Sequence, residues 1–283
     1  MDTRPLVSVI TPCYNGARFL SIFLDSLLDQ SYKNIEFIFI NDGSTDNTKK
    51  IFYSYVQRLK KKGYKVIYLK HNNNHGQAAA LNKGLKYFTG KYLTWPDADD
   101  ILHKDNIRLR VEFLEAHKKY GMVVCESPIL GKNLTILKIR RRIRPKYDSN
   151  LFQDLLTENN VTFAGGAYLF RVSSFLQVNP EKEIYVARGG QNWQMILPMA
   201  YRYKCGYITE RLYLIRNHPG SHSRKISGLK ARIKRINEHE NILLHTLDRI
   251  NMSAVQKKEY QAIIKNKYTK RRKYETIRFG SKL

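Results

Sequence analysis

An alternation of short apolar runs with amphipathic stretches over residues 7–125 constrains the fold more than any other feature of this sequence. The apolar runs have the length of strands and lie at residues 7–11, 35–40, 65–69, 92–95 and 122–125. Apolar residues at helical spacing predict helices between them, over residues 16–30, 44–62, 77–88 and 104–119. Such an alternation predicts an α/β, Rossmann-like fold with a mostly parallel sheet covered by helices. Ligands of these folds bind where the carboxyl ends of the strands emerge.

Three carboxylates, Asp97, Asp99 and Asp100, follow the apolar run at residues 92–95, in a chain whose net charge is +26. Like charges this close together cost free energy unless a cation or hydrogen-bond donors offset them. Oxygen ligands at this end of a strand suit Mg²⁺ or Mn²⁺ that holds a phosphate-bearing ligand. A solvated turn, in which an Asp caps the helix that begins near His103, explains the same residues without a metal.

The regular alternation ends at about residue 126. We expect a hairpin over 129–139, a helix over 149–157, a strand over 167–170, a helix over 191–203 and strand-like residues over 207–216. From Leu229 onward two helices are predicted, and apolar residues form one stripe on the first of them. The stripe consists of Leu229, Ile233, Ile236, Leu243, Leu244, Leu247 and Ile250.

Basic residues are concentrated at the end of the chain. Residues 224–283 hold 17 basic and 5 acidic residues, a net charge of +12. This excess favours nucleic acid, anionic lipid headgroups or phosphorylated substrates as partners. The 19 tyrosines are compatible with nucleic-acid binding, but the basic residues are concentrated in segments without an aromatic-interleaved recognition motif. We therefore expect no specific nucleic-acid partner.

Three widely spaced cysteines, Cys13, Cys125 and Cys205, favour neither a disulfide framework nor a zinc site, and a reducing cytoplasm suits them. The apolar run at residues 6–10 is too short for the core of a signal peptide, and no run has the length that spans a bilayer. We expect a cytoplasmic protein.

Four loop motifs in a fixed order resemble those of the family 2 glycosyltransferases of the GT-A fold. They read Val-Ser-Val-Ile-Thr-Pro-Cys-Tyr-Asn at 7–15, Asn-Asp-Gly-Ser-Thr-Asp at 41–46, Asn-His-Gly-Gln-Ala-Ala-Ala-Leu-Asn-Lys-Gly at 74–84 and Asp-Ala-Asp-Asp at 97–100. Each motif alone is weak, but the ordered set is specific. The resemblance covers roughly residues 6–216. It implies a GT-A domain over residues 1–223, with a nucleotide-sugar-binding half (1–125) and an acceptor-binding half (126–223), followed by a basic helical extension (224–283).

The resemblance implies that a nucleotide-diphospho-sugar binds at this edge of the sheet. Tyr14 would stack on uracil and Asp42 would accept a hydrogen bond from its imide N–H, which favours a UDP-sugar. Asp97 would contact the ribose or the donor sugar, and Asp99 together with Asp97 would hold Mn²⁺ or Mg²⁺. Asp100 would support or cap the turn. The implied nucleotide-sugar-binding residues are Thr11, Pro12, Tyr14, Asp42, His75, Gly76, Asn82, Asp97, Ala98 and Asp99.

The loop from His218 to Arg224 would close over the pyrophosphate, with Ser221, His222 and Arg224 as donors, or it is a basic linker into the C-terminal helices. A departure from the family pattern follows a double glycine, at Gln191 and Asn192. Inverting members usually carry Glu-Asp there, and the Asp accepts the proton of the acceptor hydroxyl. Neutral amides cannot act as a general base near neutral pH.

Three explanations of this departure remain open. The amides orient the acceptor while another group takes the proton, the acceptor is a phosphate or otherwise acidic nucleophile, or the chain is a non-catalytic relative. The other groups considered are Glu181, Glu183, Glu158 and His222. Because every donor-side motif is intact we favour the first explanation, with Gln191, Asn192 and Glu183 as the catalytic residues.

These observations together predict a metal-dependent, inverting glycosyltransferase. It would move a sugar from a UDP-linked donor to a saccharide or lipid-linked acceptor in cell-surface polysaccharide or glycolipid synthesis. Its basic extension would attach it peripherally to the anionic inner face of the cell membrane. The alternatives are a non-catalytic relative, a basic nucleic-acid-binding protein and a nucleotidyltransferase, whose phosphate loop is typically richer in Gly, Arg and Lys than residues 11–16.

Overall fold

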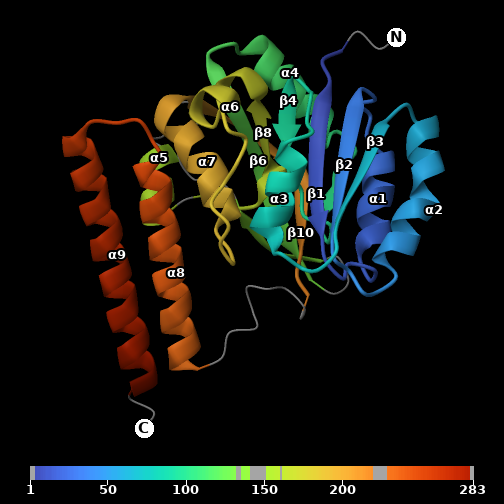
Figure 1. Cartoon of the computed structure of the whole chain (residues 1–283). Helices are drawn as coiled ribbons and strands as arrows, with labels where there is room; N and C mark the ends of the chain where they lie inside the picture. The colour runs from blue at the N-terminus through green and yellow to red at the C-terminus, as the bar shows by residue number, and fades with distance from the viewer. Residues whose placement is uncertain (1–3, 132–134, 141–150, 160, 219–227, 281–283) are drawn as a thin grey trace.

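The computed structural model describes residues 4–131, 135–140, 151–159, 161–218 and 228–280 (Figure 1). In these residues the strands form one sheet in the order β3-β2-β1-β4-β8-β6-β10-β5, and β7 and β9 also pair with β6. The strands are β1 Val7–Cys13, β2 Ile35–Asp42, β3 Lys65–His71, β4 Tyr92–Thr94, β5 Ile101–Leu102, β6 Tyr120–Leu130, β7 Ile136–Arg140, β8 Tyr168–Arg171, β9 Lys204–Arg211 and β10 Tyr213–Arg216.

Helices cover this sheet and continue beyond it. They are α1 Leu20–Leu28, α2 Thr48–Lys61, α3 Gln77–Leu85, α4 Asn106–Ala116, α5 Leu151–Thr157, α6 Val172–Val178, α7 Gln191–Arg202, α8 Leu229–Asp248 and α9 Ala254–Gly280, with a 3₁₀ turn at Gly165–Ala167. The predicted α/β fold, with a mostly parallel sheet and a helical C-terminal part, is confirmed. The predicted boundary at residue 223 lies outside the described residues and stays a prediction.

The first four strands pair in parallel, as the alternation predicts. In β1, Val7 pairs with Ile35 of β2 on one side and with Tyr92 of β4 on the other. At the far end Asp42 of β2 pairs with His71 of β3. Because the strands run in one direction, the loops that follow them meet at one edge, the lower edge in Figure 1.

Alternate residues of β2 face helices on opposite sides of the sheet, which explains why its apolar run is continuous. The Phe39 ring stacks on Phe52 of α2 with ring centroids 4.4 Å apart. Ile40 instead faces α3, where Gly84 allows a close approach. A Cβ on Gly84 would lie 2.8 Å from Ile40 Cδ1 and 2.5 Å from Ile10 Cγ2, so the tight packing of α3 requires glycine at this position.

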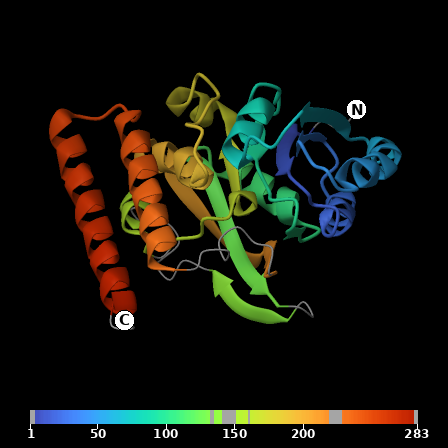
Figure 2. The same ribbon diagram turned by 60° about the horizontal axis from the view of Figure 1, so that its bottom comes forward.

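The second half of the sheet is mixed, since β8 runs antiparallel to both of its neighbours, β4 and β6. Strand β6 is longer than the prediction over 122–125, because its last residues leave β8 and pair with β7 and β10. This pairing confirms the predicted hairpin, which extends at the edge of the sheet in Figure 2, while residues 132–134 of its turn lie outside the described residues. Helix α6 and strand β5 were not predicted.

The strand-like residues 207–216 form two strands, β9 and β10, instead of one. Leu212 lies between them, and its carbonyl oxygen accepts hydrogen bonds from His103 N (2.9 Å) and Asn106 Nδ2 (2.7 Å). The chain therefore changes partners at this point, from β9 along β6 to β10 between β6 and β5. A run of apolar residues does not show such a break, because both strands have the same local pattern.

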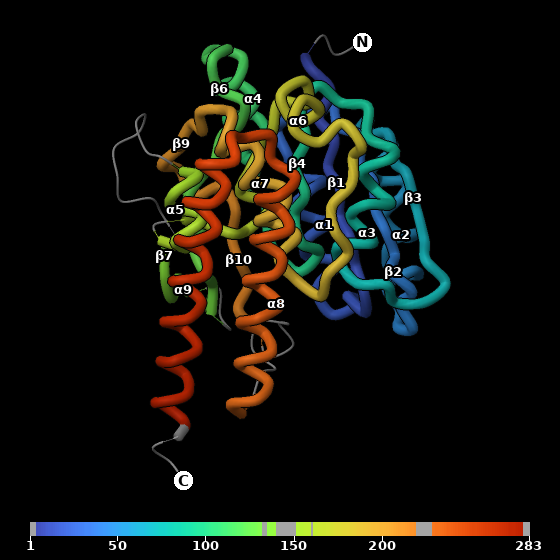
Figure 3. The backbone as a smooth tube through the Cα atoms, turned by 60° about the vertical axis from the view of Figure 1, so that its left-hand side comes forward, coloured from blue at the N-terminus to red at the C-terminus, as the bar shows by residue number. Residues whose placement is uncertain are grey.

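Helices α8 and α9 lie side by side next to α7 (Figures 1 and 3). The apolar stripe of α8 turns inward, since Ile236, Leu243, Leu247 and Ile250 are buried in the common core. Ile264 and Tyr268 of α9 are buried in the same core. No helix among the described residues has both the length and the apolar character needed to cross a bilayer.

Candidate active site

Hydrogen bonds join the loop after β1 to the loop after β2. Asn15 has φ +48° and uses its backbone N–H to donate to Ser44 Oγ (3.0 Å), while its side-chain Oδ1 accepts from Thr45 N (2.8 Å). Ala17 N donates to Asp46 Oδ2 (3.0 Å). The first two sequence motifs therefore form one tied unit at the carboxyl edge of the sheet.

The predicted base-binding residues lie on or next to this unit. Tyr14 is 44% exposed at the edge, so its ring is accessible to a ligand. Thr11 is buried in β1, and its Oγ1 has no hydrogen-bond partner among the described residues. Pro12 lies between them and is partly buried.

Asp42 ends β2 and holds the loop that leads to α3. Its Oδ1 accepts from His75 N (3.1 Å) and lies 2.6 Å from His71 Nδ1, and its Oδ2 accepts from Gly76 N (2.8 Å). Gly76 has φ +88° as the residue before α3, a conformation that favours glycine. The carboxylate is only 2% exposed, so its first observable role is to shape this loop.

The three carboxylates after β4 come together. One oxygen from each of Asp97, Asp99 and Asp100 lies within 4.8 Å of the others. Gln77 Nε2 donates to Asp97 Oδ1 (2.6 Å), and Asp97 N donates to Tyr213 Oη (3.1 Å). These contacts attach the turn to the first residue of α3 and to β10, so elements distant in sequence position the acidic cluster.

Burial and mutual repulsion raise the pKa values in this cluster. Burial, with the charge of Asp99 added, raises the pKa of Asp97 to about 7. Burial and the charges of Asp99 and Asp97 raise the pKa of Asp100 well above its ordinary value, although Arg216 N donates to Asp100 Oδ1 at 2.8 Å. A divalent cation would remove this repulsion, and a set of carboxylate oxygens is what Mg²⁺ and Mn²⁺ bind. The residues therefore fit a divalent metal ion.

His218 is a site residue that sequence reasoning did not assign to the metal cluster. Its Nε2 lies 2.7 Å from Asp99 Oδ2, and its ring packs on Phe19 with centroids 4.3 Å apart. The guanidinium of Arg216 lies 4.8 Å from the centroid of the same Phe19 ring. A His just after a strand that ends at the same edge was the available signal. Ser221, His222 and Arg224 lie outside the described residues.

The double glycine Gly189–Gly190 directly precedes α7. Gly190 has φ +70°, and a Cβ there would lie 2.8 Å from Ile242 Cγ2 of α8. Two residues later, Asn192 Oδ1 accepts from Trp95 Nε1 (2.8 Å), and Asn192 Nδ2 donates to the Phe163 carbonyl oxygen. The structure thus joins the start of α7 to the end of β4. Gln191 is partly exposed beside this bridge.

Other predicted residues also bond within the protein. The Asn82 amide accepts from Ile184 N and donates to Ile184 O, each at 2.8 Å, and so fixes the chain on the way to the double glycine. The neighbouring Glu183 has a 55% exposed side chain, and its Oε2 lies 3.5 Å from Lys86 Nζ. Ala98 is buried within the acidic turn. The role of each toward a ligand stays a prediction.

Glu158, one of the groups considered as a base, is held by α9. It forms ion pairs with Lys267 (2.8 Å) and Arg271 (3.1 Å) and accepts from Tyr268 Oη (2.7 Å). Burial by itself raises the pKa of Glu158, but Lys267, Tyr268 and Arg271 outweigh burial and lower it. The carboxylate therefore anchors α9 to the end of α5.

Comparison with known proteins identifies the family. Residues 8–178 match the family described as glycosyl transferase family 2. The chain belongs to this family, as the four loop motifs predict.

Two bacterial proteins illustrate the sequence relationship. The chain is 44% identical over 153 residues to an uncharacterized glycosyltransferase of Rickettsia prowazekii, covering 52% of this chain and 46% of that protein. It is 39% identical over 111 residues to the putative teichuronic acid biosynthesis glycosyltransferase TuaG of Bacillus subtilis, covering 39% of this chain and 42% of that protein. The chain thus spans less than half the length of these curated relatives.

Solved structures share the fold. S. aureus TarS 1–349 in complex with UDP-GlcNAc has a TM-score of 0.70 at 17% identity, over 93% of this chain and 72% of that one. The mannosyltransferase PcManGT from Pyrobaculum calidifontis, in complex with GDP-Man and Mn²⁺, has a TM-score of 0.62 at 18% identity, over 93% and 69%. At these identities the likeness concerns the fold, which confirms the predicted GT-A class.

Proposed function

We propose that the protein is a metal-dependent, inverting glycosyltransferase that moves a sugar from a UDP-sugar to a saccharide or lipid-linked acceptor. The observation that carries the proposal is the cluster of Asp97, Asp99 and Asp100 at the sheet edge where the family's loop motifs meet. The likeness to TuaG, a putative teichuronic acid biosynthesis glycosyltransferase, supports a role in the synthesis of a cell-surface polysaccharide. The UDP-GlcNAc bound by TarS supports a UDP-linked donor.

For the donor, the exposed Tyr14 ring would stack on the base, next to the unpartnered hydroxyl of Thr11 and to Pro12. Asp42, with His75 and Gly76, would border the base, and its carboxylate would add an acceptor for the imide N–H to the bonds it already makes. Asn82 and Ala98 would shape the sugar side of the pocket. Uracil presents the N–H that this carboxylate requires.

Asp99 and Asp97 would hold Mn²⁺ or Mg²⁺, and His218 is placed to join them through Nε2. The bound ion would stabilise the negative charge that grows on the departing nucleoside diphosphate. PcManGT was solved with Mn²⁺, which supports this choice of ion. Ser221, His222 and Arg224 follow His218 in the sequence and would donate hydrogen bonds to the pyrophosphate.

For the acceptor, Gln191 at the start of α7 would hydrogen-bond the attacking hydroxyl. Glu183, on the segment that Asn82 fixes, is our candidate for the proton acceptor because its carboxylate is exposed and, among the described residues, pairs with Lys86 alone. Glu158 is a poorer candidate, since three groups of α9 already surround it. Residues 1–125 would thus bind the donor, residues 126–223 the acceptor, and residues 224–283 an anionic surface.

Peripheral attachment to the inner face of the cell membrane completes the proposal. Most of the apolar stripe of α8 is packed in the core, so attraction would come from the basic residues of the extension and would be electrostatic. A lipid-linked acceptor would be presented at such a surface. The charge of residues 224–283 is the observation that supports this location and partner.

A panel of nucleotide-sugars tests the proposed function directly. Thermal unfolding is measured with each nucleotide-sugar in the presence and absence of Mn²⁺, because a ligand of the folded state raises its apparent stability. We expect stabilisation by a UDP-sugar with Mn²⁺, accompanied by release of UDP and transfer or slow hydrolysis of the sugar. Binding of a UDP-sugar without any turnover would instead favour a non-catalytic relative.

A further inference from the structure

The side chain at position 192 bridges two groups with opposite hydrogen-bonding needs. The indole Nε1–H of Trp95 can only donate, and the backbone oxygen of Phe163 can only accept. Asn192 meets both, since its Oδ1 accepts from Trp95 at 2.8 Å and its Nδ2 donates to Phe163 O. The partners themselves therefore define which end of the amide is oxygen and which is nitrogen.

An ionised carboxylate cannot make this bridge. It has the size of the amide, and one oxygen could still accept from Trp95, but the other would face the Phe163 carbonyl oxygen without a hydrogen. Trp95 is 3% exposed, so water has little access to separate the two oxygens. A buried acceptor that faces another acceptor loses its hydrogen bond and is repelled as well. Only a protonated carboxyl would restore both contacts.

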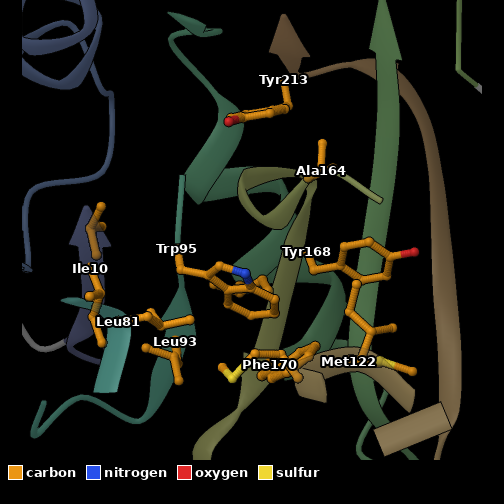
Figure 4. Packing of buried hydrophobic residues seen from close by; sticks show 14 of the residues in the cluster. Ile10, Leu81, Leu93, Trp95, Met122, Ala164, Tyr168, Phe170 and Tyr213 are labelled. Atoms are coloured by element: carbon orange, nitrogen blue, oxygen red, sulfur yellow. The ribbon is translucent and has the colours of Figure 1, made fainter. Parts of the chain in front are cut away.

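The bridge holds a tightly enclosed indole. Trp95 lies among the core residues shown in Figure 4, with its ring centroid 4.6 Å from that of Phe170. A Cβ on Gly165 would lie 2.3 Å from Trp95 Nε1, so glycine is required for the indole to occupy this place. Trp95 is followed directly by Pro96 and Asp97. The position of the indole therefore helps set the start of the acidic turn.

We infer that Asn192 is a positioning residue that couples the first turn of α7 to Trp95, and through Trp95 to the turn that carries Asp97. Its amide matches fixed protein partners, which explains why this chain has Asn where a carboxylate would serve as a base. The proton of the acceptor therefore leaves to a group other than residue 192. This last statement rests on the proposed function, whereas the bridge itself does not.

Asn192→Asp tests whether the bridge requires both a hydrogen-bond acceptor and a hydrogen-bond donor at residue 192. Gln191→Glu is the matched control. Both variants add one carboxyl to the start of α7, but only the first adds it to the bridge. Thermal unfolding is followed from about pH 5 to about pH 8 for both variants and the wild type. The titratable groups on the elements around the bridge, Asp97, Tyr213 and His239, are common to all three proteins.

We expect Asn192→Asp alone to show an additional loss of stability as the pH rises. The introduced carboxyl bridges only when protonated, so folding raises its pKa, and its contribution is present at low pH and lost as the pH rises through that value. A pH profile of stability that matches Gln191→Glu would overturn the inference. So would transfer activity of Asn192→Asp that equals or exceeds the wild type and increases with pH, which is the behaviour of a general base.

Asn192→Ala separates positioning from contact with the acceptor. In a Trp193→Phe background, Trp95 is the remaining tryptophan of the chain, so its emission reports directly on the bridge. We expect a shifted emission maximum and Mn²⁺ binding weakened roughly two- to tenfold, the range for one lost hydrogen bond. Unchanged emission and Mn²⁺ affinity, with only the KM for the acceptor increased, would show instead that Asn192 contacts the acceptor.

The readouts of unfolding, emission and metal binding do not require turnover. If the wild type transfers no sugar from any nucleotide-sugar, the proposed function fails while the bridge can still be confirmed by stability and emission. If the wild type is active but Asn192→Asp behaves as a base, the inference fails and the proposed function stands.

Discussion

The proposed donor side and the proposed acceptor side of the site are built differently. On the donor side, charged groups are concentrated: burial, together with the mutual repulsion of Asp97, Asp99 and Asp100, raises the pKa values of Asp97 and Asp100. On the acceptor side, neutral amides such as Asn192 and Gln194 make paired bonds within the protein, the latter with both backbone groups of Tyr185 at 2.6 and 2.8 Å.

This difference indicates that the two sides would recognise their ligands in different ways. A crowded set of carboxylates is unfavourable until a cation neutralises it, so the acidic cluster fits a divalent metal ion. Amides that already bond to the chain favour a fixed shape over proton transfer. The carboxylates of the proposed donor side therefore indicate metal binding. The amides of the proposed acceptor side indicate a fixed arrangement of the chain.

The largest effect is expected from Asp99→Asn. The amide keeps the shape of the side chain but removes the charge that would bind the metal, so metal-dependent turnover should fall by at least about a hundredfold. Transfer assays with Mn²⁺, and with chelator on the wild type, measure this effect. Asp29→Asn, at an exposed Asp that ends α1, is the control and should keep full activity. Full activity of the wild type in chelator would refute a metal site.

Asp42→Ala tests whether Asp42 both stabilises the fold and binds UDP. It removes the acceptor for His75 N and Gly76 N, so unfolding and UDP binding should each lose about 1 to 3 kcal/mol. Urea denaturation and calorimetry with UDP measure the two losses separately. Lost stability with unchanged affinity for UDP would make Asp42 a residue of the loop only.

On the acceptor side, Gly190→Ala should cost about 1 to 2 kcal/mol, since a side chain disfavours the left-handed backbone of this residue. The contact of its new Cβ with Ile242 adds to this loss. Gly189→Ala is the matched control, because its Cβ would meet only His239 Nε2, at 4.0 Å. Equal stability of the two variants in urea denaturation would contradict the role of α8 in shaping this turn.

A pH dependence should distinguish the two sides further. Because the pKa of Asp97 is raised to about 7, the metal-free protein should lose stability as the pH rises through that value, when the carboxyl becomes charged among like charges. Protons compete with Mn²⁺ below this value, so binding should weaken about tenfold per pH unit there. The rise in Tm on adding Mn²⁺ should therefore be larger at about pH 8 than at about pH 6. A constant rise would argue against Asp97 as a ligand.

The smallest effect concerns the outer face of α9. Lys270 and Lys273 are exposed. Replacing each by Glu should weaken binding to anionic vesicles by about 1 kcal/mol or more per residue, and high salt should weaken it as well. Co-sedimentation at low and high salt measures this. Lys49→Glu and Lys50→Glu serve as the control, because they make the same change in charge on α2, at the opposite end of the molecule from α9 (Figure 1). Binding that is absent at low salt, or unchanged in high salt, would contradict an electrostatic attachment.

Much of the donor side could be predicted from sequence, because each part is local. Apolar runs of strand length and apolar residues at helical spacing locate the strands and helices, and parallel pairing then brings the loops after β1, β2, β3 and β4 to one edge. Glu158 shows the limit of this reasoning. Its sequence position near the end of a predicted helix made it a candidate base, but Lys267, Tyr268 and Arg271, more than a hundred residues later, take up its carboxylate.

The sequence by itself determined the alternating fold, the order of the motifs and the presence of three carboxylates after β4. Only the tertiary structure decided that His218 reaches Asp99, 119 residues away, and that Asn192 bridges Trp95, 97 residues away, and Phe163. The physical reason is that hydrophobic periodicity reports how each segment faces the core, whereas hydrogen-bond partners across the chain depend on how the packed elements meet. An amide in place of a carboxylate is visible in the sequence, but the groups that require an amide are visible only in the fold.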